Sequence, residues 1–409
     1  MIIMILGKII NYIEIIFRKM VVVYNTSNFT KQLNKININN YNDKRVVFID
    51  TDCIVGGSQK ITIQLGLSLN HYNYSSVYIA TESYGSAKDW KKKIIKSFTD
   101  FIDIRMSINK ESKLIKALKI IKPNYIIITN SKLGYKITPK IKRLYPNVII
   151  YDIIHASINN YNKFIVTDEF VENIDLRIAA CDGLKQNLIE NYSEISRESF
   201  KERVVVINNG TKINPLQNNN IKTTLRKDLN IKKSEFLVLF IGSFAEHKDP
   251  MSILKISKKL SQDFDDIHFV LFGNGPLKRQ LQYYIHKFGI SRNTHMIVNS
   301  NSVYDILSES DVLILPSIIE SLGLVILEAM SMGVPPIVSN VGYQNEIIDD
   351  EIDGFLIERY NNFIDKFIDK IIFLKNNKQI YLKIKNNALI KVKNKYDVNR
   401  TLKNYHHYL

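Results

Sequence analysis

The chain alternates short apolar segments with amphipathic ones, and it does so in two successive series. The first series opens with the apolar segment 46–50, the glycine pair Gly56-Gly57 and the apolar-periodic segment 58–70. A strand, a glycine turn and a helix in this order form the opening unit of a doubly wound parallel sheet. A second series begins at 236–242 and repeats the alternation. The pattern predicts an α/β protein with two Rossmann-like doubly wound domains.

The remaining apolar segments place the other expected elements. In the first series we expect further strands at 76–80, 125–129, 148–154, 178–180 and 204–207, and a helix at 112–121. In the second series we expect strands at 268–273, 295–298, 311–316 and 334–339, and helices at 250–260, 277–288, 304–308 and 323–332. Ligands of such sheets bind beyond the carboxyl ends of the strands, so we expect a site in a cleft between the two domains.

The length of 409 residues exceeds what one ordinary core supports. The Asn-rich segment 208–222 contains Gly and Pro and is typical of a linker between domains. We expect four parts, namely an amphipathic segment with an Asn-rich linker at 1–44, a first Rossmann-like domain at 45–215, a second Rossmann-like domain at 216–390, and a C-terminal helix at 391–409. The two cysteines, Cys53 and Cys181, are too few for a disulfide framework or a cysteine metal site, and they favour a reducing compartment.

The formal net charge of +16 favours acidic partners such as nucleic acid, phosphorylated substrates or an anionic membrane surface. No Lys/Arg block is interleaved with aromatic residues, and we interpret the dense cluster Lys91-Lys92-Lys93 as a solvated helix face. Nucleic acid is therefore not an expected partner.

Residues 1–20 are very apolar but are interrupted at helical spacing by Lys8, Asn11, Glu14 and Arg18. This spacing predicts an amphipathic helix rather than a membrane-spanning one. The absence of a small-residue cleavage site argues against a signal peptide. A helix that lies on the membrane surface is one interpretation. The alternatives are a helix docked on the body of the protein, or a start of the natural protein at Met20.

Two glutamates, Glu320 and Glu328, stand eight positions apart between an apolar strand segment and an apolar helix segment. We expect Glu320 in the loop before the helix and Ser321 as the helix N-cap. The next amides would be unpaired donors at the positive end of the helix, which suits phosphate or sugar oxygens. Gly323 would allow a ligand to approach the backbone closely. Glu328 could accept hydrogen bonds from two vicinal hydroxyls.

The wider segment carries a longer pattern around these two glutamates. Its ordered residues are Pro316, Ser317, Glu320, Gly323, Leu327, Glu328, Ala329, Met330, Gly333, Pro335, Gly342, Glu346 and Gly354. This stretch resembles the signature of the family 4 retaining glycosyltransferases, also called glycosyltransferase group 1, which have the GT-B fold. The resemblance extends over residues 45–405. It implies two Rossmann-like domains that face a central cleft and a C-terminal helix that crosses back to the first domain.

Other matching positions carry the resemblance into the rest of the chain. Gly57 belongs to the glycine pair that the family places near the donor phosphates and the acceptor. His155 ends an Asp/His segment that begins at Asp152, and the family's histidine there contacts the donor sugar. The turn 273–276, with Gly275 inside it, matches a Gly-x-Gly-Pro turn near the nucleotide base.

The segment 242–248 resembles the family's phosphate clamp, and it differs from the usual clamp at one position. Lys248 is kept and would neutralise the diphosphate as a point charge. Ser243 replaces the usual arginine, so stabilisation of the leaving group is weakened or falls to another base. Two smaller departures are Leu322 in place of an aromatic residue and Tyr343 in place of the second glycine of a Gly-Gly-x-x-Glu pattern.

The resemblance implies a set of site residues. His155, Lys248 and Glu320 are the expected catalytic residues, with Glu320 holding sugar hydroxyls. The expected donor-binding residues are Gly57, Ser243, Gly275, Ser321, Leu322, Gly323, Leu324 and Glu328, and Glu328 would hold the ribose. We expect neither a metal nor a cofactor, because a nucleotide sugar serves as co-substrate.

We therefore expect a retaining, metal-independent glycosyltransferase of the hexosyltransferase type. It would move a sugar from a nucleotide-diphosphate sugar, with a UDP-sugar favoured, to a glycan, a lipid-linked saccharide or a protein side chain, as in polysaccharide biosynthesis. One alternative is a GT-B sugar-nucleotide epimerase or phosphorylase-like protein. The other is a degenerate subunit that stabilises a partner transferase, and Ser243 is its main support. The expected location is cytoplasmic, or peripheral on the cytoplasmic face of an anionic membrane.

Overall fold

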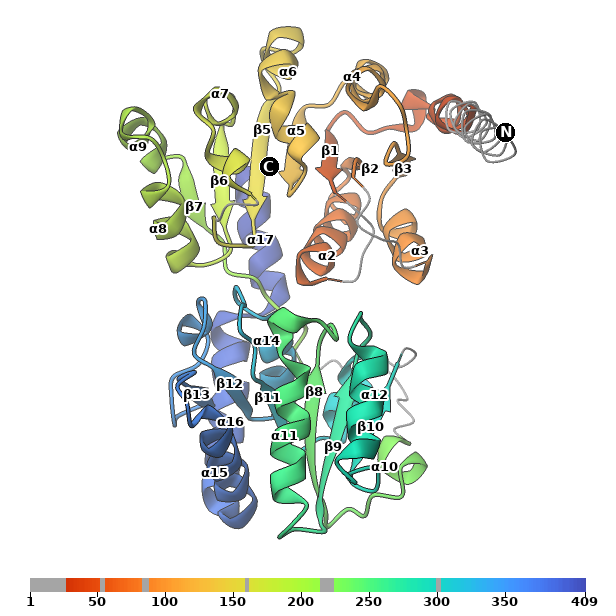
Figure 1. Cartoon of the computed structure of the whole chain (residues 1–409). Helices are drawn as coiled ribbons and strands as arrows, with labels where there is room; N and C mark the ends of the chain where they lie inside the picture. The colour runs from red at the N-terminus through yellow and green to blue at the C-terminus, as the bar shows by residue number, and fades with distance from the viewer. Residues whose placement is uncertain (1–26, 52–55, 83–87, 159–161, 214–223, 299–302) are drawn as a thin grey trace, which may run out of the picture. The chain divides into compact units, whose positions relative to one another are not determined.

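The computed structural model describes residues 27–51, 56–82, 88–158, 162–213, 224–298 and 303–409 (Figure 1). The chain divides into two compact units. The N-terminal unit contains the chain up to Ala180 together with Leu184–Val206 and Tyr405–Leu409. The C-terminal unit contains Cys181–Gly183 and Ile207–Asn404. Residues 1–20, the expected amphipathic segment, lie outside the described residues.

The N-terminal unit is built on a seven-stranded parallel sheet of order β3-β2-β1-β4-β5-β6-β7. Its strands are β1 (Arg45–Asp50), β2 (Ser75–Ala80), β3 (Asp100–Asp103), β4 (Tyr125–Thr129), β5 (Ile149–Ile154), β6 (Leu176–Ala179) and β7 (Val204–Val206). The connections contain η1 (Ile38–Asn40), α2 (Gly57–His71), α3 (Lys88–Ser97), α4 (Lys110–Ile121), α5 (Lys132–Lys136), α6 (Thr138–Leu144), η2 (Lys163–Val166), α7 (Asp168–Val171), α8 (Asp182–Glu190) and α9 (Glu194–Lys201). Strands β1 and β2 are buried along almost their whole length, as expected of a parallel sheet that is covered on both faces.

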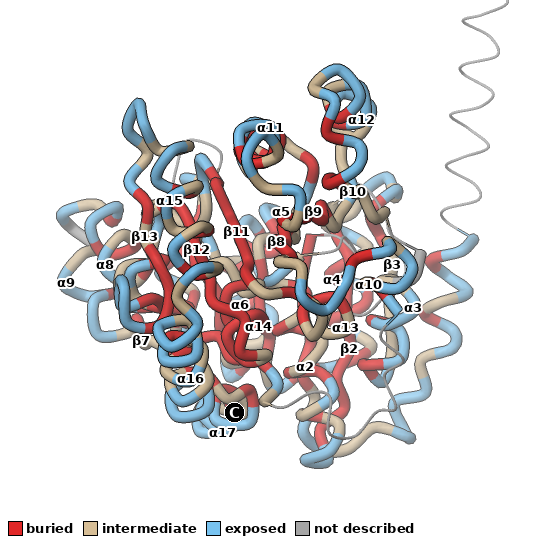
Figure 2. Tube along the Cα trace, turned by 90° about the horizontal axis from the view of Figure 1, so that it is seen from below, coloured by how far each residue is buried: buried red, intermediate tan, exposed pale blue. Residues whose placement is uncertain are grey.

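The C-terminal unit repeats this plan around a six-stranded parallel sheet of order β10-β9-β8-β11-β12-β13. Its strands are β8 (Phe236–Ile241), β9 (Ile267–Phe272), β10 (Thr294–Ile297), β11 (Val312–Leu315), β12 (Pro336–Ser339) and β13 (Phe355–Ile357). Its helices are α10 (Leu225–Asp228), η3 (Glu246–Lys248), α11 (Pro250–Leu260), α12 (Lys278–Lys287), α13 (Val303–Ser308), α14 (Leu324–Ser331), η4 (Gln344–Glu346), α15 (Phe363–Asn376), α16 (Lys378–Lys395) and α17 (Val398–Tyr408). Figure 2 shows the strands β11, β12 and β13 of this sheet as buried segments.

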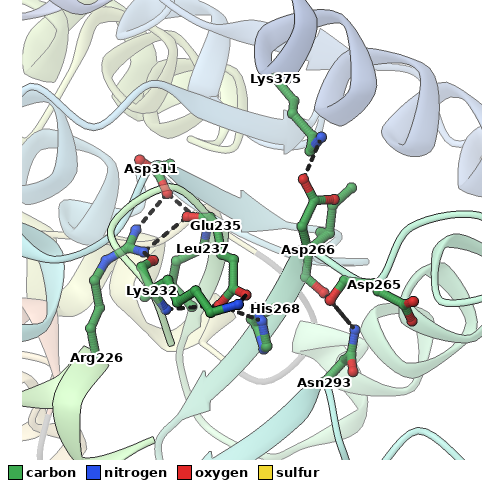
Figure 3. A network of polar contacts seen from close by, with 11 residues as sticks. Arg226, Lys232, Glu235, Leu237, Asp265, Asp266, His268, Asn293, Asp311 and Lys375 are labelled. Carbon is green, nitrogen blue, oxygen red and sulfur yellow. Dashed lines mark hydrogen bonds and ion pairs between the residues drawn. The ribbon is translucent and has the colours of Figure 1, made fainter. Parts of the chain in front are cut away.

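A polar network holds the amino ends of the strands in the C-terminal sheet (Figure 3). The Nη2 atom of Arg226, on α10, donates to the carboxylate of Asp311 at 2.7 Å, and its Nη1 atom donates to the carbonyl oxygen of Glu235 at 2.9 Å. Glu235 and Asp311 immediately precede β8 and β11. The network therefore fastens the start of this unit to the amino edge of its sheet, opposite the carboxyl edge at which ligands of such sheets bind.

The last helix, α17, begins in the C-terminal unit and ends in the N-terminal unit. Near its start, Thr401 Oγ1 donates to the carbonyl oxygen of Asn208 at 2.8 Å. Near its end, His406 Nε2 lies 2.8 Å from Ser68 Oγ on α2. The predicted return of the C-terminal helix to the first domain is confirmed.

The structure departs from the predicted elements in three places. Residues 27–35, inside the segment interpreted as a linker, are helical, because Phe29 and Leu33 supply an apolar stripe that is buried. The strands β3 and β13 were not predicted. Both are short edge strands, and β3 has only two apolar residues, flanked by an aspartate on each side in the sequence DFID. Within the described residues, no helix is long and apolar enough to span a bilayer.

Candidate active site

Two loops at the carboxyl edge of the C-terminal sheet bring Lys248 and Glu320 together. The first loop follows β8 and the second follows β11. The carbonyl oxygen of His247 accepts hydrogen bonds from the amides of Ile318 at 2.9 Å and Ile319 at 3.2 Å, which ties the loops side by side. Lys248 Nζ then forms a hydrogen-bonded ion pair with Glu320 Oε2. The side chains are only 19% and 12% exposed, so the pair is partly shielded from water.

Arg359, which the sequence reasoning missed, fastens the same two loops. Its Nη2 atom lies 2.8 Å from the carboxylate of Asp249, the neighbour of Lys248. Its Nη1 atom donates to the carbonyl oxygen of Pro316, at the end of β11. Its sequence signal was weak, because the strand β13 that ends two positions before it was not predicted either. Because its guanidinium is already bound on two sides, Arg359 positions the Lys248 loop.

A third loop, which follows β12, packs on Glu320. The amide of Tyr343 donates to the carbonyl oxygen of Ser321 at 2.9 Å. Gly342 has φ +64°, and a Cβ atom there would clash with the carbonyl oxygen of Glu320. The first glycine of the motif is therefore required by this close approach of the two loops, and the third loop fixes the backbone that carries Glu320.

The start of α14 differs from the prediction at the N-cap. The N-cap residue is Gly323, with φ +70°, and Ser321 does not cap the helix. The carbonyl group of Ser321 is used by the third loop, and its buried hydroxyl has no hydrogen-bond partner among the described residues. Leu322 is buried, and Leu324 is the first helical residue. The amide of Ile326 donates to the carbonyl oxygen of the N-cap Gly323 at 2.8 Å, and the amides of Leu324 and Val325 lie too near the helix start to have an acceptor within the helix.

Glu328 lies in the second turn of α14 and is 5% exposed. Tyr304 on α13 is close enough to interact with it electrostatically, since burial and then the Glu328 charge raise the pKa of Tyr304 to about 12. The Tyr304 hydroxyl is 3.1 Å from Thr211 Oγ1. Sequence reasoning missed Tyr304, because a single tyrosine in a chain that has 22 carries no local signal.

Ser243 and Gly275 lie in two loops that dock on one another. The amide of Phe244 donates to the carbonyl oxygen of Asn274, and the amide of Leu277 donates to that of Phe244, both at 2.9 Å. A Cβ atom at Gly275 would clash with the backbone of Phe244. The glycine is therefore needed for packing. Ser243 is exposed beside this junction, at the position where the resembling family has arginine.

In the N-terminal unit, Gly57 is the first residue of α2 and His155 follows β5. Both ring nitrogens of His155 are buried and have no hydrogen-bond partner among the described residues. Burial lowers the pKa of His155 to about 4, so its imidazole is neutral at neutral pH. A neutral imidazole can donate a hydrogen bond to a sugar hydroxyl through one nitrogen and accept one through the other.

Asp152, the other end of the Asp/His segment, is not available to a ligand. It lies inside β5 and forms a fully buried ion pair with Arg177 on β6, with Arg177 Nε 2.9 Å from its Oδ2 atom. Arg177 also donates to the hydroxyl of Tyr192 and to the carbonyl oxygen of Ile165, and Tyr135 donates to Asp152. The pair ties β5 to β6 and to η2, and so fixes the strand that precedes the histidine.

The neutral state of His155 predicts a pH effect on stability. Its folded pKa of about 4 lies below the ordinary value of 6.5. As pH falls below 6.5, the unfolded chain takes up a proton that the folded state does not, so stability is lost between pH 6.5 and 4. We expect the melting temperature of the His155→Asn variant to fall less between pH 7 and pH 5 than that of the wild type. A His155 ring signal that titrates near pH 6.5 in NMR spectra would contradict this.

Comparisons with known sequences find proteins that are similar to part of this chain. The profile described as "Glycosyl transferases group 1" matches residues 221–390. The UDP-Gal:alpha-D-GlcNAc-diphosphoundecaprenol alpha-1,3-galactosyltransferase of Escherichia coli is 34% identical over 39% of this chain and 42% of that protein. The N-acetyl-alpha-D-glucosaminyl L-malate synthase of Bacillus anthracis is 31% identical over 33% of this chain and 35% of that protein. These matches span less than half the length of either relative.

Solved structures resemble the chain over most of its length. Anabaena Alr3699/HepE in complex with UDP-glucose has a TM-score of 0.75 and 15% identity, and the match covers 89% of this chain and 98% of that one. The sucrose-phosphate synthase of Thermosynechococcus elongatus has a TM-score of 0.70 and 15% identity, with 89% and 98% covered. At this level of identity the likeness shows the shared fold.

Proposed function

We propose that the protein is a retaining glycosyltransferase with a nucleotide-diphosphate sugar as donor, because residues 221–390 match the group 1 glycosyltransferase profile and the chain has the GT-B fold. The observation that carries the proposal is the Lys248–Glu320 pair at the carboxyl edge of the C-terminal sheet, with Glu328 buried in the next helix. This edge is where ligands of doubly wound sheets bind.

Each member of this group has a role in the proposal. Lys248 neutralises the diphosphate, assisted by the first-turn amides of α14. Glu320 leaves Lys248 when the donor binds and accepts hydrogen bonds from sugar hydroxyls, while Glu328 accepts them from the ribose. A UDP-sugar is favoured, and this preference is supported by the UDP and UDP-glucose complexes among the structural neighbours.

The proposed reaction needs no nucleophile from the protein. The bond between the anomeric carbon and the diphosphate oxygen breaks, and the acceptor oxygen bonds to that carbon on the same face. The configuration is retained because the new bond forms on the face from which the diphosphate departs, and the acceptor proton passes to the departing phosphate oxygen. The protein contributes positioning and stabilises the charge that develops on the diphosphate. The proposal assigns this charge to Lys248 and backbone amides rather than to a metal.

We further propose a lipid-linked saccharide as the acceptor, in a hexosyl transfer at the cytoplasmic face of a membrane. Support comes from the E. coli relative, whose name specifies a diphosphoundecaprenol-linked acceptor. The net charge of +16 is also compatible with a diphosphate-linked acceptor. The other expected acceptors, a glycan without a lipid and a protein side chain, are the alternatives.

The test is a screen of UDP-, GDP- and ADP-sugars with a short prenyl-diphosphate saccharide and with the same saccharide lacking the lipid. We expect a UDP-sugar to be consumed only when acceptor is present, to give an α-linked product from an α-linked donor, and to do so equally in EDTA. Inversion at the anomeric carbon, or loss of transfer in EDTA that is restored by a divalent metal, would contradict the proposal.

A second candidate is a degenerate subunit that stabilises a partner transferase. The observation in its favour is the exposed Ser243 at the arginine position of the phosphate clamp. Failure of the purified protein to bind any nucleoside diphosphate would favour this candidate.

A further inference from the structure

One residue at the edge of the N-terminal sheet joins three surface elements. Asp103 ends the edge strand β3. Its amide donates to Gln32 Oε1 at 2.8 Å, which attaches helical residues 27–35. Its carboxylate lies 2.9 Å from Lys91 Nζ on α3 and 2.9 Å from Arg105 Nη2, in the loop that leads to α4. The helical residues, α3 and the loop are therefore fixed side by side along one edge of the sheet.

This junction does not depend on pH in the physiological range. Burial acts to raise the pKa of Asp103, but hydrogen bonds from Arg105 and Lys91 outweigh burial and lower the pKa to about 2. The carboxylate is therefore charged at neutral pH, and both cations stay bound to it.

The outer face of α3 is basic with an aliphatic residue in its middle. Lys92, Lys93 and Lys96 are exposed, and Ile95 is 46% exposed. Ile94, on the inner face, is fully buried, so the helix is docked through its apolar side and its lysines face outward. The predicted solvated face is confirmed for Lys92 and Lys93 but not for Lys91, which pairs with Asp103. The face also carries an apolar residue that solvation alone does not explain.

The loop between β3 and α4 adds two more exposed apolar side chains. Met106 is 63% exposed and Ile108 is 54% exposed. The residues before them are anchored, because Ile104 is buried and Arg105 is bound to Asp103. An anchored loop that presents two long aliphatic side chains beside a lysine-rich helix matches the interface of an anionic bilayer, where lysines meet lipid phosphates and aliphatic groups enter between the headgroups.

We propose that α3 and the loop 104–109 form a docking surface for an anionic lipid membrane. We call it the α3 surface, defined by Lys92, Lys93, Ile95, Lys96, Met106 and Ile108. The positive charge of the exposed lysines is complementary to the negative charge of the lipid headgroups, which favours this partner. A single-stranded nucleic acid would need a series of aromatic platforms for stacking. Helix α3 carries one aromatic residue, Trp90, whose ring centroid lies 5.0 Å from Lys93 Nζ, and the exposed apolar members of the surface are aliphatic. The surface would bring a lipid-linked acceptor to the N-terminal unit, so it deepens the proposed function, although its test needs no turnover.

Residues 1–20 lie outside the described residues, and the proposal does not depend on them. The competing surface is on α16, which also carries exposed lysines together with Leu382 and Ile390. It therefore serves as the matched control.

The test is flotation of the full chain with vesicles of phosphatidylcholine, with and without phosphatidylglycerol. The triple variant Lys92→Gln/Lys93→Gln/Lys96→Gln should bind the anionic vesicles about a hundredfold more weakly than the wild type, because each lysine near an anionic surface contributes about 1 kcal/mol. Met106→Ser/Ile108→Ser should also weaken binding. The control Lys378→Gln/Lys383→Gln/Lys393→Gln on α16 removes the same charge and should bind like the wild type.

Three outcomes would overturn the proposal. They are no flotation of the wild type with anionic vesicles, equal flotation of the α3 triple variant, and a loss with the α16 control as large as that with the α3 variant. Thermal melting of each variant excludes unfolding as the cause. Transfer to the short prenyl-diphosphate saccharide in the absence of vesicles, measured in parallel, separates this proposal from the proposed function, since the α3 variants should retain it.

Discussion

Lys248→Met is expected to lower kcat/KM for sugar transfer by a factor of about 10²–10³, the usual loss when one group that stabilises developing charge is removed. Lys248 is held at the carboxyl edge by the Glu320 ion pair and by the hydrogen bonds of its neighbour His247. Because Ser243 stands where the resembling family has arginine, the proposed function places a larger share of the diphosphate charge on this lysine. Steady-state kinetics with the identified donor measures the loss.

Two companion variants separate charge from packing. Lys248→Arg keeps the cation and should retain more activity than the methionine variant. Glu320→Gln removes the carboxylate that occupies Lys248, so it should bind UDP alone more tightly than the wild type while its transfer rate falls, because the neutral amide is a weaker acceptor for sugar hydroxyls. Weaker UDP binding in Glu320→Gln, or normal turnover in Lys248→Met, would contradict the assigned roles.

Glu328→Ala is expected to abolish measurable transfer. The carboxylate is buried in α14. The variant cannot accept the hydrogen bonds that the ribose hydroxyls would donate to this carboxylate. Alanine favours the helix, so the fold should persist and the melting temperature should change little. Calorimetric titration with UDP should show the same loss of binding.

The matched control for this variant is Glu246→Ala, an exposed glutamate two positions before Lys248. It should transfer at the wild-type rate. Wild-type turnover by Glu328→Ala would show that the donor site lies elsewhere.

The sequence predicted most of the fold, because buried parallel strands are continuous apolar runs. The strand Tyr125–Thr129 and the helix Pro250–Leu260 have the predicted bounds. The edge strands β3 and β13 were not predicted, because an edge strand can be short and does not need a continuous run of apolar residues. The helix at residues 27–35 was not predicted, because the many Asn residues of this segment made it look like a linker although Phe29 and Leu33, one turn apart, are buried.

The candidate site was less predictable than the fold. The spacing of Glu320 and Glu328 placed one in a loop and one in the following helix, as found. The prediction of Ser321 as the N-cap was wrong, because the positive φ of Gly323 and the contact of Ser321 with Tyr343 depend on a loop that is distant in the sequence. Arg359 escaped for the same reason. The roles of all the site residues in catalysis stay predictions.

Hydrogen–deuterium exchange with and without UDP decides whether the carboxyl edge of the C-terminal sheet is the donor site. The account predicts slower exchange of amides in residues 242–249, 273–277 and 317–328 on addition of UDP, and no such change in the Glu328→Ala variant. Protection confined to residues 45–206, or none at these three segments at a UDP concentration that saturates binding, would contradict it.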